Sequence, residues 1–235
     1  MHKLVLFDID GTILLTAGAG RRAIVAAIGE FVGSTKALHQ VRFDGKTDPQ
    51  IVTELLAAAG HPGPHEPSRV EALCSRYVDL LQHELQQSTS KTTVMPGVLP
   101  LLERLEKEDG VILGLLTGNV ARGAALKLLS AGLAPERFRV GAYGSDSAHR
   151  PELPPIAARR AEPYFGRVPS GADVVIIGDT PADIACGACI DARAVGVATG
   201  AYSVSDLISC GPHAAFEDLS DTDRVLEAIF APHVS

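Results

Sequence analysis

The chain has 235 residues, of which 46% are hydrophobic and 21% charged, as is ordinary for a folded protein. Its net charge is −7 and it contains no block of basic residues, which argues against a nucleic-acid-binding protein. No run of about 18 apolar residues is present, so we expect no membrane span. A small anionic substrate stays compatible with the acidic balance, because a local field can oppose the global charge.

The start of the chain and its cysteines favour a cytoplasmic protein. Met1-His2-Lys3 leads straight into a short apolar run that stops at Asp8, so we see no targeting segment. Among the four cysteines only Cys186 and Cys189 have suggestive spacing, and no second pair completes a zinc site. A reducing compartment fits this usage. We expect a monomer or a homodimer.

The first part of the chain changes from a strand to a helical block. The apolar run at residues 3–7 is typical of a buried parallel strand. Residues 21–87 are then helical in pattern, with helices expected over 21–32, 50–59 and 67–87. We expect Asp48 to cap the second of these helices, with Pro49 in its first turn, and Gly60 to stop it.

After residue 88 strands and helices alternate. We predict strands at residues 111–116, 140–143, 173–177 and 192–198, and helices at 98–107, 120–131, 155–164, 181–188 and 225–230. Such alternation predicts a parallel sheet with helices on both faces. The predicted fold class is therefore α/β: a doubly wound core of residues 1–15 and 91–235, with a helical insertion of residues 16–90.

Polar residues follow three of the apolar strands where each strand ends. They are Asp8, Asp10, Gly11 and Thr12 after the first, Thr117, Gly118 and Asn119 after the second, and Gly178, Asp179, Thr180 and Asp183 after a later one. Ligands of open parallel sheets bind beyond the carboxyl ends of the strands, so these acids should converge. Converging carboxylates repel one another unless they are protonated or paired with a cation. Their hard oxygens suit Mg²⁺ together with a substrate phosphate.

Helix capping is the alternative for single acids in this set. Asp179 precedes a predicted helix and alone would serve as its cap. Capping does not account for two acids at alternate positions after the first strand, Asp8 and Asp10. The set as a whole therefore indicates metal-assisted chemistry on a phosphate.

Three segments resemble motifs of the haloacid dehalogenase superfamily, in its phosphatase branch. Phe7-Asp8-Ile9-Asp10-Gly11-Thr12 resembles the first motif, Leu116-Thr117-Gly118-Asn119 the second and Gly178-Asp179-Thr180-Pro181-Ala182-Asp183 the fourth. Their order and spread match over nearly the whole chain. The resemblance implies a Rossmann-like core with an inserted helical cap that closes over the active site and excludes water.

The resemblance also implies residue roles. Asp8 would attack phosphorus and form an aspartyl-phosphate, while Asp10 would protonate the leaving oxygen and then activate water. Mg²⁺ would be held by Asp8, the main-chain carbonyl of Asp10 and Asp179, with support from Asp183. Thr117 would donate its hydroxyl to the phosphoryl group. The segments expected to contact the other phosphate oxygens contain Gly11, Thr12, Gly118 and Asn119.

The third motif departs from the commonest pattern, which has a lysine. Residues 144–155 contain no lysine, and Arg150, followed by a proline, is the best match. An arginine can neutralise phosphate charge and bind it with two hydrogen bonds. Arg159 and Arg160 lie inside a predicted helix and are expected to be surface charges.

The loop at residues 44–48, between predicted helices of the insertion, is the best candidate for substrate selection. Its Lys46 would meet a substrate anion; the alternative is a solvated surface lysine beside Asp48 as a plain helix cap. Residues 18–23 read GxGxxA, but they do not directly follow a strand, so a hinge explains these glycines better than a dinucleotide site.

The sequence thus predicts a Mg²⁺-dependent phosphomonoester hydrolase that acts on a small phosphorylated metabolite through an aspartyl-phosphate. The resemblance is closest to phosphoglycolate-phosphatase-like and beta-phosphoglucomutase-like members. A phosphosugar mutase is one alternative, because the same residues can return the phosphate to a sugar. A non-catalytic binding protein on the same fold is the alternative from another class.

Overall fold

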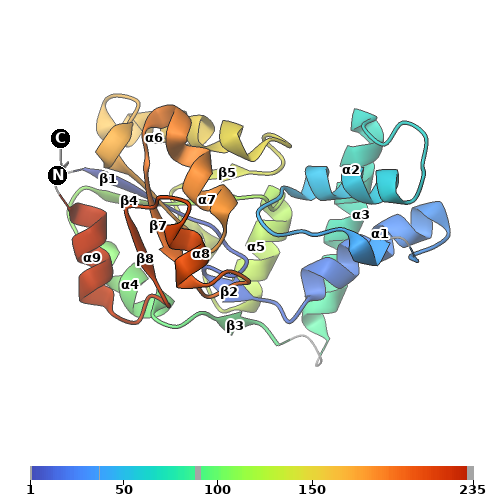
Figure 1. Ribbon diagram of the computed structural model, residues 1–235, viewed down its shortest axis with the longest axis horizontal. Helices are drawn as coiled ribbons and strands as arrows, with labels where there is room; N and C mark the ends of the chain where they lie inside the picture. Colours follow the sequence, from blue (N-terminus) through green and yellow to red (C-terminus); the bar gives the residue numbers. More distant parts are fainter. Residues whose placement is uncertain (1, 37, 88–90, 232–235) are drawn as a thin grey trace.

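The structure, a computed structural model, describes residues 2–36, 38–87 and 91–231, and its centre is a six-stranded parallel sheet (Figure 1). The strand order is β5-β4-β1-β6-β7-β8. The strands are β1 (Lys3–Phe7), β4 (Val111–Thr117), β5 (Val140–Tyr143), β6 (Val174–Gly178), β7 (Arg193–Val197) and β8 (Ala214–Phe216). β1 lies between β4 and β6, with Leu6 opposite Gly114 on one side and Ile176 on the other. The three strands that end in the predicted site residues are therefore neighbours.

Alternating side chains of β1 point to opposite faces of the sheet, and each face has its own core. Val5 and Phe7 pack with residues of α4 (Val98–Leu105), α5 (Ala121–Ser130) and α9 (Thr222–Phe230). Leu4 and Leu6 pack with α6 (Leu153–Phe165) and α7 (Pro181–Cys186) on the other face. The short helix α8 (Val204–Ile208) contacts β7 and β8. Helices on both faces confirm the predicted doubly wound α/β fold (Figure 1).

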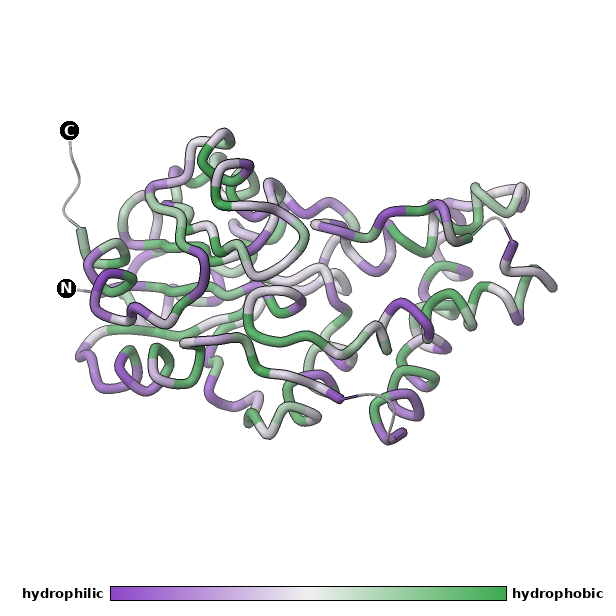
Figure 2. Tube along the Cα trace, turned by 60° about the horizontal axis from the view of Figure 1, so that its bottom comes forward, coloured by the Kyte–Doolittle hydropathy of each residue, from purple (hydrophilic) through white to green (hydrophobic). Residues whose placement is uncertain are grey.

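The helical insertion forms a second lobe beside the sheet (Figure 1). It consists of α1 (Ala19–Val32), α2 (Asp48–Ala58) and α3 (Pro67–Gln86), which share a buried apolar cluster. Along these helices hydrophilic and hydrophobic stretches alternate, as amphipathic helices require (Figure 2). Val120, at the start of α5, belongs to the same cluster, and α3 packs against α5. The insertion is thus packed onto the core next to the second motif.

Two short strands join the lobes. β2 (Leu14–Leu15) pairs antiparallel with β3 (Thr93–Val94), so the chain leaves the core and returns to it along one ribbon. The predicted boundaries between the core (residues 1–15 and 91–235) and the insertion (residues 16–90) lie next to this ribbon. The division into two domains stays a prediction. Residues 88–90 of that prediction lie outside the described residues.

The other predicted strands and helices are present, with ends that differ by a few residues. Short 3₁₀ helices add to them at Leu38–Gln40, Pro135–Arg137, Arg150–Glu152, Gly171–Asp173 and Gly187–Ile190. The cap of α2 was predicted wrongly. Thr47 caps this helix, its hydroxyl accepting from the backbone N–H of Gln50, and Asp48 is the first helical residue. In the part of the chain that the structure describes, no helix is both long and apolar enough to cross a membrane.

Candidate active site

The carboxyl ends of β4, β1 and β6 bring the predicted site residues to one edge of the sheet. They line a cavity of about 490 Å³ together with side chains of the insertion. Among the lining residues, the core contributes Asp8, Asp10, Thr117, Asn119, Lys127, Arg150 and Asp179, and the insertion contributes Arg21, Ile24, Phe43, Asp44, Lys46, Asp48, Ile51 and Tyr77. The cavity is thus polar at the sheet and mixed on the insertion side, where apolar and aromatic side chains lie beside charged ones.

Three buried aspartates form the most highly charged part of this site. Asp8, Asp179 and Asp183 each have a carboxylate oxygen within 4.8 Å of the other two. Burial raises the pKa of Asp179 to about 9, and the nearby charges of Asp183 and Asp8 add to the rise. Burial also raises the pKa of Asp8 to about 7, although the Arg150 guanidinium opposes this. Such carboxylates are stable as anions only when a cation balances them, and their hard oxygens fit a divalent metal ion.

The loop after β1 makes room for this cluster. Gly11 has φ +86°, and a Cβ atom there would lie 2.4 Å from Asp179 Oδ2, so no larger residue fits without moving the carboxylate. The neighbouring Thr12 hydroxyl donates to Asp179 Oδ1 at 3.2 Å. The carbonyl of Gly11 in turn accepts from the Thr199 hydroxyl. The predicted residues Gly11 and Thr12 therefore lie at the acid cluster, where they position Asp179.

The Asp10 carboxylate is outside the three-aspartate cluster. Its Oδ2 accepts from Asn119 Nδ2 at 2.8 Å and from Lys127 Nζ at 2.6 Å. The side chain is 42% exposed and faces the cavity. Among the four residues predicted to hold the metal, Asp10 therefore differs from the other three, and its predicted contribution stays the main-chain carbonyl.

Thr117 and Asn119 form a second polar pair, after β4. The buried Thr117 hydroxyl oxygen accepts from the backbone N–H of Asn119 at 3.3 Å and from its Nδ2 at 2.8 Å. Both bonds use the threonine as acceptor, so its own hydrogen remains for an acceptor in the cavity. Asn119 thereby links Thr117 to Asp10.

Arg150 lies beside the acids. Its Nη2 contacts Asp183 Oδ1, lies 3.2 Å from Asp8 Oδ1 and donates to the carbonyl of Leu116 at 3.5 Å. Burial works to lower the pKa of Arg150, but the carboxylates of Asp183 and Asp8 outweigh it and raise the pKa. The guanidinium is therefore a fixed cation next to the candidate nucleophile.

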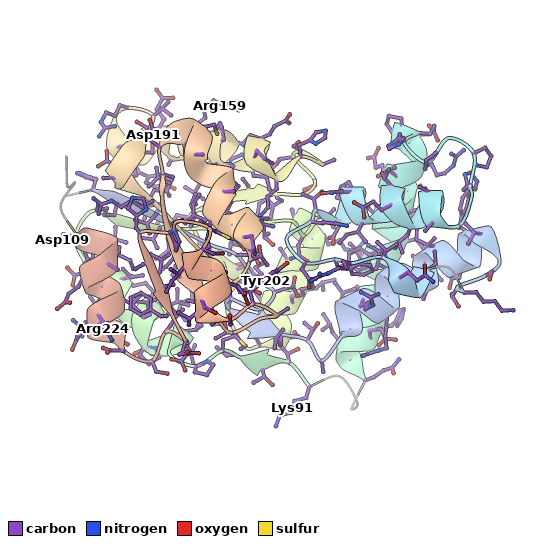
Figure 3. The ribbon with its side chains drawn as sticks, viewed as in Figure 1. Lys91, Asp109, Arg159, Asp191, Tyr202 and Arg224 are labelled. Atoms are coloured by element: carbon purple, nitrogen blue, oxygen red, sulfur yellow. The ribbon has the colours of Figure 1, made fainter. Side chains whose placement is uncertain are left out.

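The other two arginines considered for this place lie elsewhere. Arg159 is on the outer side of α6 (Figure 3), and the exposed Arg160 pairs with Asp146 at 2.6 Å. Position in the fold thus singles out Arg150 among the three.

Lys46 lines the cavity, but its charge is partly used within the insertion. Its Nζ lies 2.5 Å from Glu54 Oε2, and the side chain is only partly exposed. Lys46 is therefore a partly buried lysine at the cavity that is already paired with Glu54.

Hydrogen bonds of the Asp48 main chain and side chain hold the loop that contains Lys46 against the core. The Asp48 N–H donates to the carbonyl of Gly118 at 2.7 Å, and the Val120 N–H donates to Asp48 Oδ2 at 2.8 Å. The approach requires a glycine: a Cβ on Gly118 would lie 2.1 Å from the carbonyl oxygen of Lys46. Gly118 is thus a docking position for the insertion.

Two parts of the site were missed from the sequence. Lys127 sits in α5 among apolar neighbours, and a lysine on the buried side of an otherwise apolar helix face was the available signal. Thr199 and Gly200 follow β7 and also line the cavity. The strand-end rule used for the other three strands would have found them.

The fold and the site together are typical of α/β enzymes whose active sites lie at the carboxyl edge of the sheet, an edge that carries buried aspartates in this chain. The model of the haloacid dehalogenase-like hydrolase family matches residues 2–191. The chain belongs to the haloacid dehalogenase-like hydrolases, and it is an enzyme of their phosphatase type.

Individual proteins agree with this assignment. The chain is 30% identical over 205 residues to a phosphoglycolate phosphatase of Pseudomonas syringae pv. tomato, covering 86% of this chain and 70% of that protein. It is 25% identical over 230 residues to the probable phosphatase IndB of Dickeya dadantii, covering 97% and 95%. The crystal structure of CbbY from Rhodobacter sphaeroides in complex with phosphate has a TM-score of 0.71 at 16% identity, covering 94% and 96%. That structure shows the shared fold.

The docking of the insertion gives a first prediction. In Gly118→Ala the new methyl group collides with the backbone at Lys46, and such overpacking costs about 1–3 kcal/mol. We expect kcat/KM for a phosphate ester to fall roughly 5- to 100-fold, because the closed arrangement of the lobes is disfavoured. Gly123→Ala in α5 is the control, since its Cβ would meet its nearest neighbour at an ordinary 3.5 Å. Equal loss in both variants would contradict the docking role.

Asp48 gives a second prediction, on stability. Burial raises its pKa to about 6, above the ordinary 3.8, while Lys127 and the Val120 N–H oppose the rise. The folded state therefore binds the proton more tightly than the unfolded state, and the stability gained from this is lost as the pH rises through about 6. Asp48→Asn removes the penalty of the buried charge. The difference in the free energy of unfolding, Asp48→Asn minus wild type, should therefore increase by roughly 1–3 kcal/mol between pH 4 and pH 8.

Asp48→Ala is the matched comparison for this effect. It removes the same charge, but it also leaves the Val120 N–H without its acceptor, at a cost of about 1–3 kcal/mol at every pH. Denaturant titrations over the pH range should therefore give parallel curves for the two variants, with the alanine curve lower. A wild-type minus Asp48→Asn difference that is independent of pH would contradict the raised pKa.

Proposed function

We propose that this enzyme is a Mg²⁺-dependent phosphomonoester hydrolase that works through an aspartyl-phosphate on Asp8. One observation supports the proposal above the others: two carboxylates two residues apart face one cavity in different electrostatic environments. Asp8 lies within the acid cluster and beside Arg150, whereas Asp10 is held outside the cluster by Asn119 and Lys127. Different environments for paired carboxylates are what different roles in catalysis require.

In the first step an oxygen of Asp8 attacks phosphorus, a new bond forms between them, and the bond from phosphorus to the ester oxygen breaks. Asp10 gives its proton to the departing oxygen. The Thr117 hydroxyl is left to donate to a phosphoryl oxygen, and the segments around Gly11 and Asn119 supply further donors. Arg150 keeps its positive charge next to Asp8 throughout.

In the second step Asp10, now ionised, takes a proton from a water molecule. The water oxygen attacks phosphorus, the bond to Asp8 breaks, and inorganic phosphate leaves with Asp8 restored. Asp8, Asp179 and the main-chain carbonyl of Asp10 would hold Mg²⁺, with Asp183 in support. When bound, the metal ion offsets the negative charge of the cluster and of the phosphate.

The substrate we propose is a small phosphorylated metabolite whose non-phosphate part lies against the insertion. The phosphatase names of two curated relatives support a hydrolase, and one of them makes 2-phosphoglycolate a compound to test first. Lys46 remains a candidate contact for a second anionic group of the substrate. A phosphosugar mutase is the alternative, and the products separate the two: free phosphate against an isomerised sugar phosphate. A cytoplasmic location and a monomer or homodimer complete the proposal.

The covalent step predicts different outcomes for the two acids of the first motif. Asp8→Asn should abolish turnover, because an amide is too weak a nucleophile to attack phosphorus. Asp10→Asn should lower turnover by about 10²–10⁴-fold, since it removes the acid and base, yet leave an acid-stable phosphoenzyme. Incubation with a ³²P-labelled phosphate ester and filter binding measures both. Full activity of Asp8→Asn would contradict the covalent mechanism.

The acid cluster predicts a metal requirement. Chelation by EDTA should remove activity, and added Mg²⁺ should restore it. Asp179→Asn removes one buried charge from the donor set, so the Mg²⁺ concentration that gives half-maximal rate should rise at least about tenfold. Asp173→Asn, at a partly exposed carboxylate just before β6, is the control and should keep the wild-type requirement. Activity that survives exhaustive chelation would contradict the proposed cofactor.

A further inference from the structure

Lys127 is a buried cation whose ammonium group is directed at Asp10. It lies in α5, its side chain is 5% exposed, and its Nζ donates to Asp10 Oδ2 at 2.6 Å. A lysine is almost never this buried unless it is paired, because removing the charge from water costs several kcal/mol. The pair therefore indicates a role that a surface lysine would not have.

Lys127 and Asn119 bind the same oxygen of Asp10. Asn119 Nδ2 approaches Oδ2 at 2.8 Å from the loop after β4, and Lys127 approaches it from α5. Within the described residues Oδ1 of Asp10 has no hydrogen-bond partner, and the side chain opens onto the cavity. One oxygen of the carboxylate is thus held by two donors, and the other is left to exchange protons.

The insertion closes around the ammonium group. A Cβ on Gly20, in α1, would lie 3.3 Å from Lys127 Nζ and 3.8 Å from the Tyr77 hydroxyl, which belongs to α3. Two acidic residues lie beside Lys127: Asp10 from the core and Asp48 from α2, where the lysine charge opposes the rise in pKa that burial causes. The docked insertion therefore shields the lysine from water and directs it to Asp10.

We infer that Lys127 is a positioning residue for Asp10: together with Asn119 it fixes the carboxylate so that Oδ1 faces the reacting oxygens. The inference rests on the proposed function, since it assigns Lys127 to the proton-transfer half of that reaction. It assigns no part in the attack by Asp8, which lies in the separate acid cluster.

The two halves of the reaction make the inference testable with p-nitrophenyl phosphate and saturating Mg²⁺. p-Nitrophenolate leaves without being protonated, so phosphorylation of Asp8 does not need Asp10 for this substrate. Hydrolysis of the phosphoenzyme still needs it. In Lys127→Met a rapid-quench experiment should give a burst of about one p-nitrophenolate per enzyme at the wild-type rate. The following steady rate should be lowered at least about tenfold.

Three further variants sharpen the test. Lys127→Arg keeps a cation within reach of Asp10 and should recover part of the steady rate. Asp10→Asn combined with Lys127→Met should be no slower than Asp10→Asn alone, because the lysine acts through that carboxylate. Arg122→Met changes an exposed cation of α5, paired with Asp79 at 2.9 Å, and should behave as wild type.

The outcomes separate positioning from the other roles of a buried lysine. If Lys127 had a purely structural role, part of the variant would misfold and the burst amplitude would fall. The steady rate divided by the burst amplitude would then equal the wild-type value, and this result would overturn the inference. A raised KM with unchanged rates also overturns it and assigns Lys127 to substrate binding. Equal slowing of the burst and of the steady rate would also overturn the inference. If wild type needs no Mg²⁺, or Asp8→Asn stays active, the proposed function fails before Lys127 is tested.

Discussion

The mutual repulsion of three buried carboxylates is the constraint on which the rest of this site depends. Asp8, Asp179 and Asp183 come within 4.8 Å of one another at the edge of the sheet, where water screens them poorly. Arg150 balances part of this charge from the side of Asp8 and Asp183. Burial, reinforced by the charges of Asp183 and Asp8, raises the pKa of Asp179, so a further cation would favour the charged form of this carboxylate. The three-aspartate cluster therefore requires a further positive charge, and it lies at the cavity that the proposed phosphate substrate would enter.

The same constraint explains why the site is built at strand ends and on glycine. Strands can deliver three carboxylates to one point only if they are neighbours, and β1 lies directly beside β6. Asp179 can then approach the first loop only because Gly11 has no side chain. At the insertion side of the cavity Gly118 likewise has no side chain, so the backbone at Lys46 can pack closely against the core. Close packing of backbone thus encloses the charges and keeps the surrounding dielectric low.

Much of this arrangement could be predicted from the sequence, because the signals are local. An apolar run followed at once by polar residues marks a strand end, so Asp8, Thr117 and Asp179 were placed correctly at one edge. The sequence could not reveal which groups pair across the fold. The bond from Asp48 to Val120 joins residues 72 positions apart, and local spacing favoured Asp48 as a helix cap instead. Lys127 reaches Asp10 over 117 positions, and no local pattern carries that information.

The environment of Asp10 also bears on the choice between hydrolysis and phosphate return to a sugar. Both reactions need a carboxylate that delivers and then removes a proton, so the first motif alone does not separate them. Holding Oδ2 between Asn119 and Lys127 leaves Oδ1 as the oxygen that can serve either a water or a sugar hydroxyl. In the proposed mechanism the insertion would select what reaches Oδ1, since Phe43, Ile51 and Tyr77 line the cavity beside the charged Lys46 and Asp48. We therefore expect the insertion to discriminate between the two acceptors, and the sheet edge to supply the chemistry that both reactions share.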